Sequence, residues 1–310
     1  RYIQLRKICY STVMFENLFA VGGLSLDRLK NFMEVAEKGS IARVADGDSS
    51  RQSLISRQIS ELETFFGTEL TRRKGKGLEI TEAGNELARQ VRLQFQGLAD
   101  FKASWSGKPV EFRIASGNSV LEWLVAPNMS PIAKAVPGNT FALLDWRTGD
   151  VVRGLLDHTV DFGIIRKSAL VKPLKFLPLG RISYRLFVPK ALMRGTGRNL
   201  SDLPLAISIG GEFLQAIEKA NSGQLPPIKY RCTSFTQAAQ LVRSGVAAAI
   251  LPHIATGSLA GQAVGKDLPW MKNVVRDLGL AWHQRLADVR PGADKIREAL
   301  AETLSQRLKS

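Results

Sequence analysis

Cysteine and histidine, the side chains that most often bind metals in proteins, are scarce in this sequence of 310 residues. The two cysteines, Cys9 and Cys232, lie far apart and form neither a metal-binding nor a disulfide pattern. The three histidines, His158, His253 and His283, lack the spacing of metal ligands. We therefore expect no metal, no cofactor, and a reducing, cytoplasmic compartment.

Long apolar runs and the common catalytic motifs are missing as well. No run of about 18 or more apolar residues occurs, so we expect no membrane-spanning segment. The stretch Arg194-Gly195-Thr196-Gly197 comes nearest to a phosphate-binding loop, but it lacks the Lys-Ser/Thr ending. No G-x-S-x-G motif occurs, and no histidine lies beside a nucleophile. These absences argue against an enzyme.

Positive charge is abundant but unevenly placed. The chain has 43 Lys and Arg against 28 Asp and Glu, a net charge of +15. Residues 1–23 and 24–108 each carry a net +2, whereas residues 109–310 carry +11. A basic chain suggests nucleic-acid binding, yet this distribution does not place a nucleic-acid site in the first half.

The first 23 residues are basic and apolar, but Glu16 and Asn17 interrupt any signal-peptide core. We interpret residues 1–23 as an extension outside the domains, with Met14 as a plausible start of the protein. An additional arm that reaches DNA is the alternative interpretation.

Three helical patterns follow. Ser25 can cap a first helix with the apolar face Leu26, Leu29, Phe32, Met33 and Ala36, which Gly39 ends. Ser40 can cap a second, short helix. Ser49 and Gln52 have the spacing of a capping box for a third helix that runs to Gly67. Short turns between three helices indicate a helix-turn-helix.

The third helix carries two kinds of side chain. Its apolar stripe consists of Ile55, Ile59, Leu62 and Phe66, whereas its first turns are rich in Ser, Gln and Arg rather than Lys and Glu. Ser, Gln and Arg hydrogen-bond well to base edges and phosphates. The helix is therefore a candidate for reading DNA.

A basic turn and a long helix come next. Residues 72–77 hold four basic side chains and two glycines between short extended segments, the composition of a wing that lies on phosphates. Thr81 begins a helix on the order of 35 Å long that ends before Ser106-Gly107-Lys108-Pro109. Its apolar seam comprises Leu87, Val91, Phe95, Leu98, Phe101 and Trp105, which suits a dimerisation helix or a core helix of the next domain.

The remaining sequence alternates strands with helices. Short β-type runs occupy residues 110–115, 141–146, 161–165, 184–188, 204–209 and 247–252. A closing helix over residues 293–308 would return to the first lobe. The pattern predicts an α/β domain with a second lobe inserted at about 190–260.

Residues 24–84, followed by the long helix and the two-lobed domain, resemble LysR-type transcriptional regulators. The resemblance rests on residues 26–45, 51–70 and 71–84, which include the wing ending Leu-Glu-Ile-Thr-Glu-Ala-Gly. It implies that the protein belongs to the α/β fold class and has an all-α/winged N-terminal domain. The domains would be a winged helix-turn-helix at 24–80, a linker helix at 81–108 and a two-lobed effector-binding domain at 109–310.

The resemblance also implies a DNA interface. The family's third helix lies in the major groove, which directs Gln52, Ser53, Ser56 and Arg57 toward the bases and phosphates. Arg73 and Lys76 correspond to the basic residues at the opening and tip of the wing. Thr81, Ala83 and Gly84 correspond to the start of the linker helix.

Three positions depart from the family pattern. Asp48 and Ser50 are polar where the turn before the third helix is usually apolar, and Thr71 replaces a common aromatic residue of the wing. These polar residues are expected to loosen the local packing and leave the preferred half-site open.

Small polar residues follow three strands of the second half at predicted helix N-termini, where such sheets bind ligands and anions are favoured. The positions that match the family's cleft are Ser116, Asn118, Ser119, Ser234 and Thr236, and Arg147 is a further candidate. With the +11 charge, these residues predict a small anionic effector such as a carboxylate. Their alternative role is to cap helices.

Two other classes of function fit the sequence less well than a regulator. An enzyme lacks its motifs, and a solute-binding protein does not explain the winged helix. We therefore predict a sequence-specific transcriptional regulator that binds double-stranded promoter DNA and a small effector. Its further partners would be copies of itself in a homodimer or homotetramer, and RNA polymerase.

Overall fold

The computed structural model describes residues 18, 22–74, 77–193, 202–210 and 212–309. It divides into two compact units, residues 1–98 and 99–310, which are described separately. The predicted extension, apart from Leu18 and residues 22–23, and the predicted DNA contact Lys76 lie outside the described residues. No helix in the described ranges combines the length and apolar character needed to cross a bilayer.

The first unit contains the three predicted helices, α3 (Leu26–Lys38), α4 (Ile41–Val44) and α5 (Ser49–Phe66). The side chains of Ser25 and Ser40 accept hydrogen bonds from the first turns of α3 and α4, as predicted. Gly39 and Gly67 end α3 and α5 with positive φ angles of 64°. Such a left-handed residue favours glycine because it has no Cβ.

The predicted cap of α5 is wrong by one residue. Asp48, not Ser49, precedes the helix, and its Oδ1 accepts hydrogen bonds from the backbone N–H groups of Ser50 and Arg51 at 2.8 and 3.1 Å. Asp48, one of the three departures from the family pattern, therefore caps the helix. Its short carboxylate satisfies two free N–H groups of the first turn.

The predicted helix faces need three corrections. Ile55, Ile59 and Leu62 are buried in the core of the first unit, but Phe66 is 37% exposed and lies edge-on to Phe65. On α3, Leu26 is exposed. Both residues are at helix ends, where the core no longer covers the apolar stripe.

A second correction to α3 concerns a residue absent from its predicted face. Val35 is fully buried beside Phe32 in this core. Val35 lies three residues after Phe32, on the same side of α3. The buried face of α3 is therefore wider than the predicted apolar face.

The wing consists of β1 (Thr71–Lys74) and β2 (Gly77–Ile80), paired antiparallel. Glu63 of α5 anchors β1, since its Oε1 accepts hydrogen bonds from the backbone N–H of Leu70 and Thr71 at 2.9 Å and from the Thr71 hydroxyl at 3.1 Å. Thr71 therefore replaces aromatic packing with a hydrogen bond to the third helix.

The long helix α6 (Glu82–Trp105) begins against the wing. The hydroxyl of Thr81 donates to the carbonyl of Glu69 at 2.7 Å and accepts from the N–H of Gly84 at 3.0 Å. A Cβ at Gly84 would lie 2.2 Å from the carbonyl oxygen of Leu70. Glycine is therefore required here by close approach of the helix to the wing.

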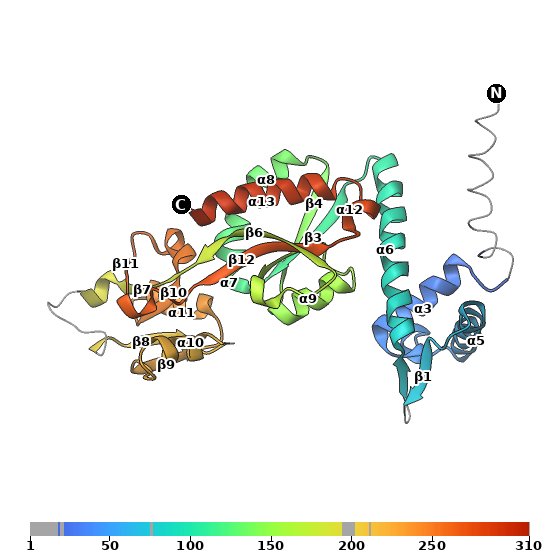
Figure 1. Ribbon diagram of the computed structural model, residues 1–310, viewed down its shortest axis with the longest axis horizontal. Coiled ribbons are helices and arrows are strands. Elements are labelled where there is room, and N and C mark those ends of the chain that lie inside the picture. Colours follow the sequence, from blue (N-terminus) through green and yellow to red (C-terminus); the bar gives the residue numbers. More distant parts are fainter. Residues whose placement is uncertain (1–17, 19–21, 75–76, 194–201, 211, 310) are drawn as a thin grey trace. The chain divides into compact units, whose positions relative to one another are not determined.

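The second unit contains two five-stranded sheets (Figure 1). In the first lobe, β3 (Val110–Ser116), β4 (Asn139–Asp145) and β5 (Phe162–Arg166) are parallel, and β12 (Arg276–His283) and β6 (Leu174–Ile182) complete the order β4-β3-β5-β12-β6. Strand β12 is antiparallel to both of its neighbours. Helix α13 (Ala293–Lys309) lies along this sheet and packs against α8 (Met129–Ala135), and α9 (Thr148–Leu156) contacts β5.

The second lobe repeats this arrangement in the order β11-β7-β10-β8-β9. Its strands are β7 (Tyr184–Pro189), β8 (Leu205–Ser208), β9 (Ile228–Cys232), β10 (Ala248–Pro252) and β11 (Ala263–Lys266). Its helices are α10 (Phe213–Ala220) and α11 (Phe235–Arg243). The lobe is wider than the predicted 190–260, because β7 and β11 both pair within its sheet.

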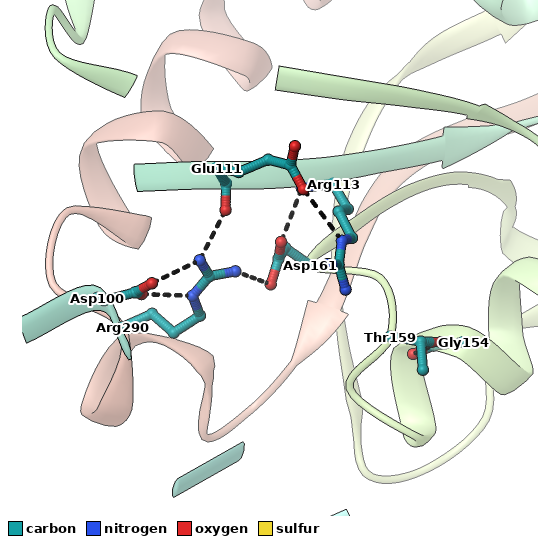
Figure 2. Close-up of polar contacts among 7 residues, drawn as sticks. All are labelled: Asp100, Glu111, Arg113, Gly154, Thr159, Asp161 and Arg290. Carbon is teal, nitrogen blue, oxygen red and sulfur yellow. Dashed lines mark hydrogen bonds and ion pairs between the residues drawn. The ribbon is translucent and has the colours of Figure 1, made fainter. Parts of the chain in front are cut away.

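A buried ion cluster fixes the last turns of α6 to the first lobe (Figure 2). Arg290 donates to both carboxylate oxygens of Asp100, at 2.7 and 3.1 Å, to Asp161 at 2.5 Å and to the Glu111 carbonyl at 2.7 Å. Its guanidinium also lies 4.3 Å from the ring centre of Phe112. Burial alone would lower the pKa of Arg290, but the hydrogen bonds and charges of Asp100 and Asp161 outweigh burial and raise it.

Candidate functional site

The predicted DNA-facing side chains lie on the side of α5 away from its core. Ser53, Ser56 and Arg57 are exposed, and Gln52 is half-buried. Ser53 donates its hydroxyl to the carbonyl of Ser49 at 3.0 Å, and Arg57 is 72% exposed with only a loose approach to Glu61 at 3.7 Å. Arg57 is therefore free to reach a partner molecule, because so exposed a pair is worth little.

The neighbouring acidic residue is already engaged. Glu61 forms a short ion pair of 2.5 Å with Arg28 of α3, which joins the first and third helices. Arg51, which was not among the predicted contacts, is exposed in the first turn of α5. Its position directly before Gln52 could have suggested it.

On the wing, two adjacent arginines differ. Arg72 pairs with Glu79 of the opposite strand at 2.8 Å, whereas the predicted contact Arg73 is exposed and has no partner among the described residues. A cross-strand pair stabilises the hairpin. The unpaired Arg73 is the residue better suited to a phosphate.

A cavity of about 620 Å³ lies between the two lobes of the second unit, and we call it the inter-lobe cleft. Strands β3, β4 and β5 deliver Ser116, Asp145 and Arg166 to it at their carboxyl ends. The second lobe contributes Ser208 at the end of β8 and Pro252 at the end of β10. The cleft thus has the location where α/β sheets bind ligands.

Five of the six predicted effector residues line this cleft. They are Ser116, Asn118, Ser119, Arg147 and Ser234. Thr236 is not among the lining residues, and its hydroxyl lies 2.9 Å from that of Ser234. Their roles in binding stay predictions.

Several of these polar groups also serve the fold. Ser116 is buried and donates its hydroxyl to the carbonyl of Ile164 at 2.7 Å. Ser234 caps α11 by accepting from the N–H of Gln237 at 3.2 Å. Ser234 therefore has the alternative role of a helix cap, and its hydroxyl also lies within hydrogen-bond distance of that of Thr236.

Asn118 and Arg147 have more capacity to bind. The side-chain amide of Asn118 donates to Asp145 at 3.1 Å, and its buried oxygen has no partner in the structure. Arg147 is exposed at the N-terminus of α9 and has no acidic partner among the described residues.

Two arginines of the cleft were missed from the sequence. Arg166 ends β5 and pairs across the lobes with Glu212 at 2.9 Å. Arg276 begins β12, lies 5.7 Å from the ring centres of Tyr184 and Phe213, and has no acidic partner in the described part of the chain. Arg166 could have been found, because it follows a predicted strand, whereas β12 itself was not predicted.

Aromatic rings form one wall near Arg276. Tyr184, Phe213 and Phe235 pack together with ring centres 4.5 to 5.8 Å apart. Burial raises the pKa of Tyr184 to about 12, although the charges of Arg276 and Arg166 act in the opposite direction. The phenol is therefore protonated at neutral pH. Cations over aromatic faces beside a cavity suit a ligand with a negative charge.

No group of three or more potential ligands in the described ranges could hold a metal ion.

Two family models match the chain. A model described as the LysR substrate binding domain matches residues 107–305, and one described as a bacterial regulatory helix-turn-helix protein of the lysR family matches residues 26–85. The transcriptional regulator HdfR of Yersinia enterocolitica is 25% identical over 84% of this chain and 91% of its own length. A probable hydrogen peroxide-inducible genes activator of Mycobacterium avium is 24% identical over 73% and 77%.

Solved structures share the fold. Full-length LysG of Corynebacterium glutamicum with bound effector Arg has a TM-score of 0.63 at 19% identity, covering 91% of this chain and 99% of LysG. Full-length CbnR in complex with its target DNA has a TM-score of 0.55 at 21% identity, covering 92% of this chain and all of CbnR. A full-length OxyR variant of Pseudomonas aeruginosa has a TM-score of 0.62 at 17% identity, covering 91% and 97%.

Proposed function

Because the chain belongs to the LysR family of transcriptional regulators, we propose that it reads promoter DNA with α5 and the wing under the control of a small anionic effector. The family comprises DNA-binding regulators, not enzymes. The observation that carries the effector assignment is the convergence of Arg147, Arg166 and Arg276 on the inter-lobe cleft.

The DNA interface is assigned to Gln52, Ser53, Ser56 and Arg57 on α5 and to Arg73 and Lys76 on the wing. The exposure of Ser53, Ser56, Arg57 and Arg73 supports it. The structure of CbnR with its target DNA shows that a chain of this fold binds DNA. Arg57 would contact a guanine edge or a phosphate, and Arg73 a phosphate.

The effector site is assigned to Asn118, Ser119 and Arg147 of the first lobe, with Arg166 and Arg276 beside them. Ser116, Ser234 and Thr236 belong to the same proposed site. Ser116 and Ser234 line the inter-lobe cleft, and the hydroxyl of Thr236 lies beside that of Ser234. LysG is described with an amino acid as its effector, and the three arginines here favour the carboxylate end of such a small molecule.

A second copy of the chain is the proposed partner of α6. Leu98, Phe101 and Trp105 of the predicted seam are 56%, 61% and 81% exposed. Large apolar side chains exposed together on one helix indicate an interface. We assign them to a homodimer or homotetramer, and RNA polymerase remains a further proposed partner of the assembly on the promoter.

The DNA assignment is tested by fluorescence anisotropy of a labelled fragment from the gene's own upstream region, across a salt series. Arg57→Ala is expected to weaken selective binding by about 1–3 kcal/mol, because a base or phosphate contact is lost. Arg153→Ala, which removes an equally exposed charge from α9, is the matched control and is expected to change little. Equal binding to random DNA, unchanged by Arg57→Ala, would refute the assignment of α5.

The effector assignment is tested by thermal shift with a panel of organic acids. A carboxylate that binds the folded protein raises the melting temperature, and Arg147→Ala should abolish most of that rise while Arg153→Ala keeps it. An acid that stabilises both variants equally, or a panel with no active member, contradicts the assignment.

A further inference from the structure

A second cavity, which we call the α10 cavity, lies beyond the ion pair of Arg166 and Glu212. Its volume is about 680 Å³, similar to that of the inter-lobe cleft. The first lobe provides Arg166, Lys167 and Ser168, and the second lobe provides one face of α10. The two cavities share Arg166, Glu212 and Arg276.

The charges around the α10 cavity are unbalanced. Its two carboxylates are already paired, Glu212 with Arg166 at 2.9 Å and Asp277 with Arg181 at 3.0 Å. Three of its cations, Lys167, Lys219 and Arg276, have no acidic partner among the described residues. Paired acids and unpaired cations around one cavity leave a net positive potential, which attracts an anion.

The remaining wall of the α10 cavity is apolar. It consists of Ala216 and Ala220 on one face of α10, with Trp270, Val274 and Val275 facing them. Small alanines leave room for a flat group, and an indole offers a surface for stacking. An apolar wall with a few charged groups at its rim is typical of small-molecule sites.

We propose that the α10 cavity is a second ligand site that takes a small aryl carboxylate. The carboxylate lies between Lys219, Lys167 and Arg276, and the ring lies against Trp270 and the two alanines. The site has its own lysines and apolar wall, apart from the effector site assigned above, although Arg166, Glu212 and Arg276 border both.

Tryptophan residues report on the two cavities independently, since Trp270 lines the α10 cavity and Trp146 lines the inter-lobe cleft. The full chain is labelled with 5-fluorotryptophan, and the fluorine resonances of Trp270 and Trp146 are assigned with Trp270→Phe and Trp146→Phe. Phenylacetate is the probe, and phenylacetamide, which has the same shape without the charge, is its control.

Phenylacetate is expected to move the Trp270 resonance saturably, whereas phenylacetamide leaves it in place. Lys219→Ala should weaken this binding about threefold to fivefold, the range for an exposed charge pair. Lys272→Ala is the matched control, because it removes a nearby exposed lysine that does not line the cavity, and it should leave the affinity unchanged.

Three results would overturn the second site: a Trp270 resonance that phenylacetate does not move, an equal response to phenylacetamide, or equal losses in Lys219→Ala and Lys272→Ala. If only Trp146 responds, the α10 site falls while the proposed effector site stands. If only Trp270 responds, the α10 site stands without support for the effector site.

Discussion

Two arginines that flank strand β12, Arg276 at its start and Arg290 beyond its end, have opposite surroundings. Arg290 is 4% exposed and is held by two carboxylates and a backbone carbonyl (Figure 2). Arg276 is half-buried, lies over aromatic rings and has no acidic partner in the described ranges. Arginine therefore occurs in two settings within one lobe: Arg290 is paired and buried, and Arg276 borders two cavities without an acidic partner among the described residues.

The difference teaches how to separate a structural charge from one that awaits a ligand. Hydrogen bonds from three of its nitrogens leave Arg290 little capacity for another molecule. Arg276 borders two cavities with most of its donors unused. Burial of an unpaired charge is costly, so a half-buried guanidinium without a carboxylate indicates a site that a ligand anion completes.

The largest expected effect is that of Arg290→Met. Removal of the guanidinium leaves Asp100 and Asp161 buried without compensation, which should lower the free energy of unfolding by about 3–5 kcal/mol. Urea denaturation followed by circular dichroism measures this loss.

The second variant needed to interpret this loss is Arg290→Met combined with Asp100→Asn and Asp161→Asn. Neutral amides carry no uncompensated charge, so part of the lost stability should return. A triple variant less stable than Arg290→Met alone would show that the carboxylates are not the source of the destabilisation.

Arg276→Gln should have a smaller effect on folding and a clear effect on binding. The free energy of unfolding is expected to change by less than about 1 kcal/mol, because no ion pair is broken. The affinity for phenylacetate in the fluorine titration should fall about tenfold, as for the loss of a charge-assisted hydrogen bond. A stability loss as large as that of Arg290→Met would erase the contrast between the two arginines.

The smallest expected effect concerns His253, which follows β10 and contacts Ser183 between β6 and β7. Its Nδ1 accepts a hydrogen bond from the N–H of Ser183 at 3.1 Å. Burial lowers the pKa of His253 below 6.5, and the charge of Arg185 adds to this, although the carbonyl oxygen of Ser183, 3.4 Å from Nδ1, opposes it. The unfolded chain therefore binds the proton more readily, and stability should decline as the pH falls below about 6.5.

His253→Asn keeps an acceptor for Ser183 but does not titrate. Melting temperatures at about pH 8 and about pH 5.5 should differ less in His253→Asn than in the wild type. An identical pH dependence in both proteins would show that groups other than His253 cause the decline.

The sequence predicted those elements that local patterns define. Ser25, Ser40, Gly39 and Gly67 delimit helices by local hydrogen bonds and backbone conformation, and all four act as predicted. The six predicted strands all exist as β3, β4, β5, β7, β8 and β10, because each contains a short apolar run. Five of them are largely buried, whereas the edge strand β4 is only partly covered.

The elements that the sequence did not reveal depend on distant partners. Strands β6, β9, β11 and β12 were not predicted, and each pairs with strands whose position only the fold determines. Arg276 was missed for this reason, since its strand joins β5 after the whole second lobe has intervened. Phe66 and Leu26 were misplaced because helical period alone does not show where a core ends.

The position of β12 has a consequence for the order of events during synthesis. Strands β5 and β6 of the first lobe must wait for β12 while the entire second lobe leaves the ribosome. At about 5–20 residues per second, that delay lasts roughly 5–20 s. During it, the facing edges of both strands are unpaired, which makes the nascent chain a candidate for chaperone binding. Arg276 arrives with β12, so the proposed effector site and the α10 cavity are completed only late in synthesis.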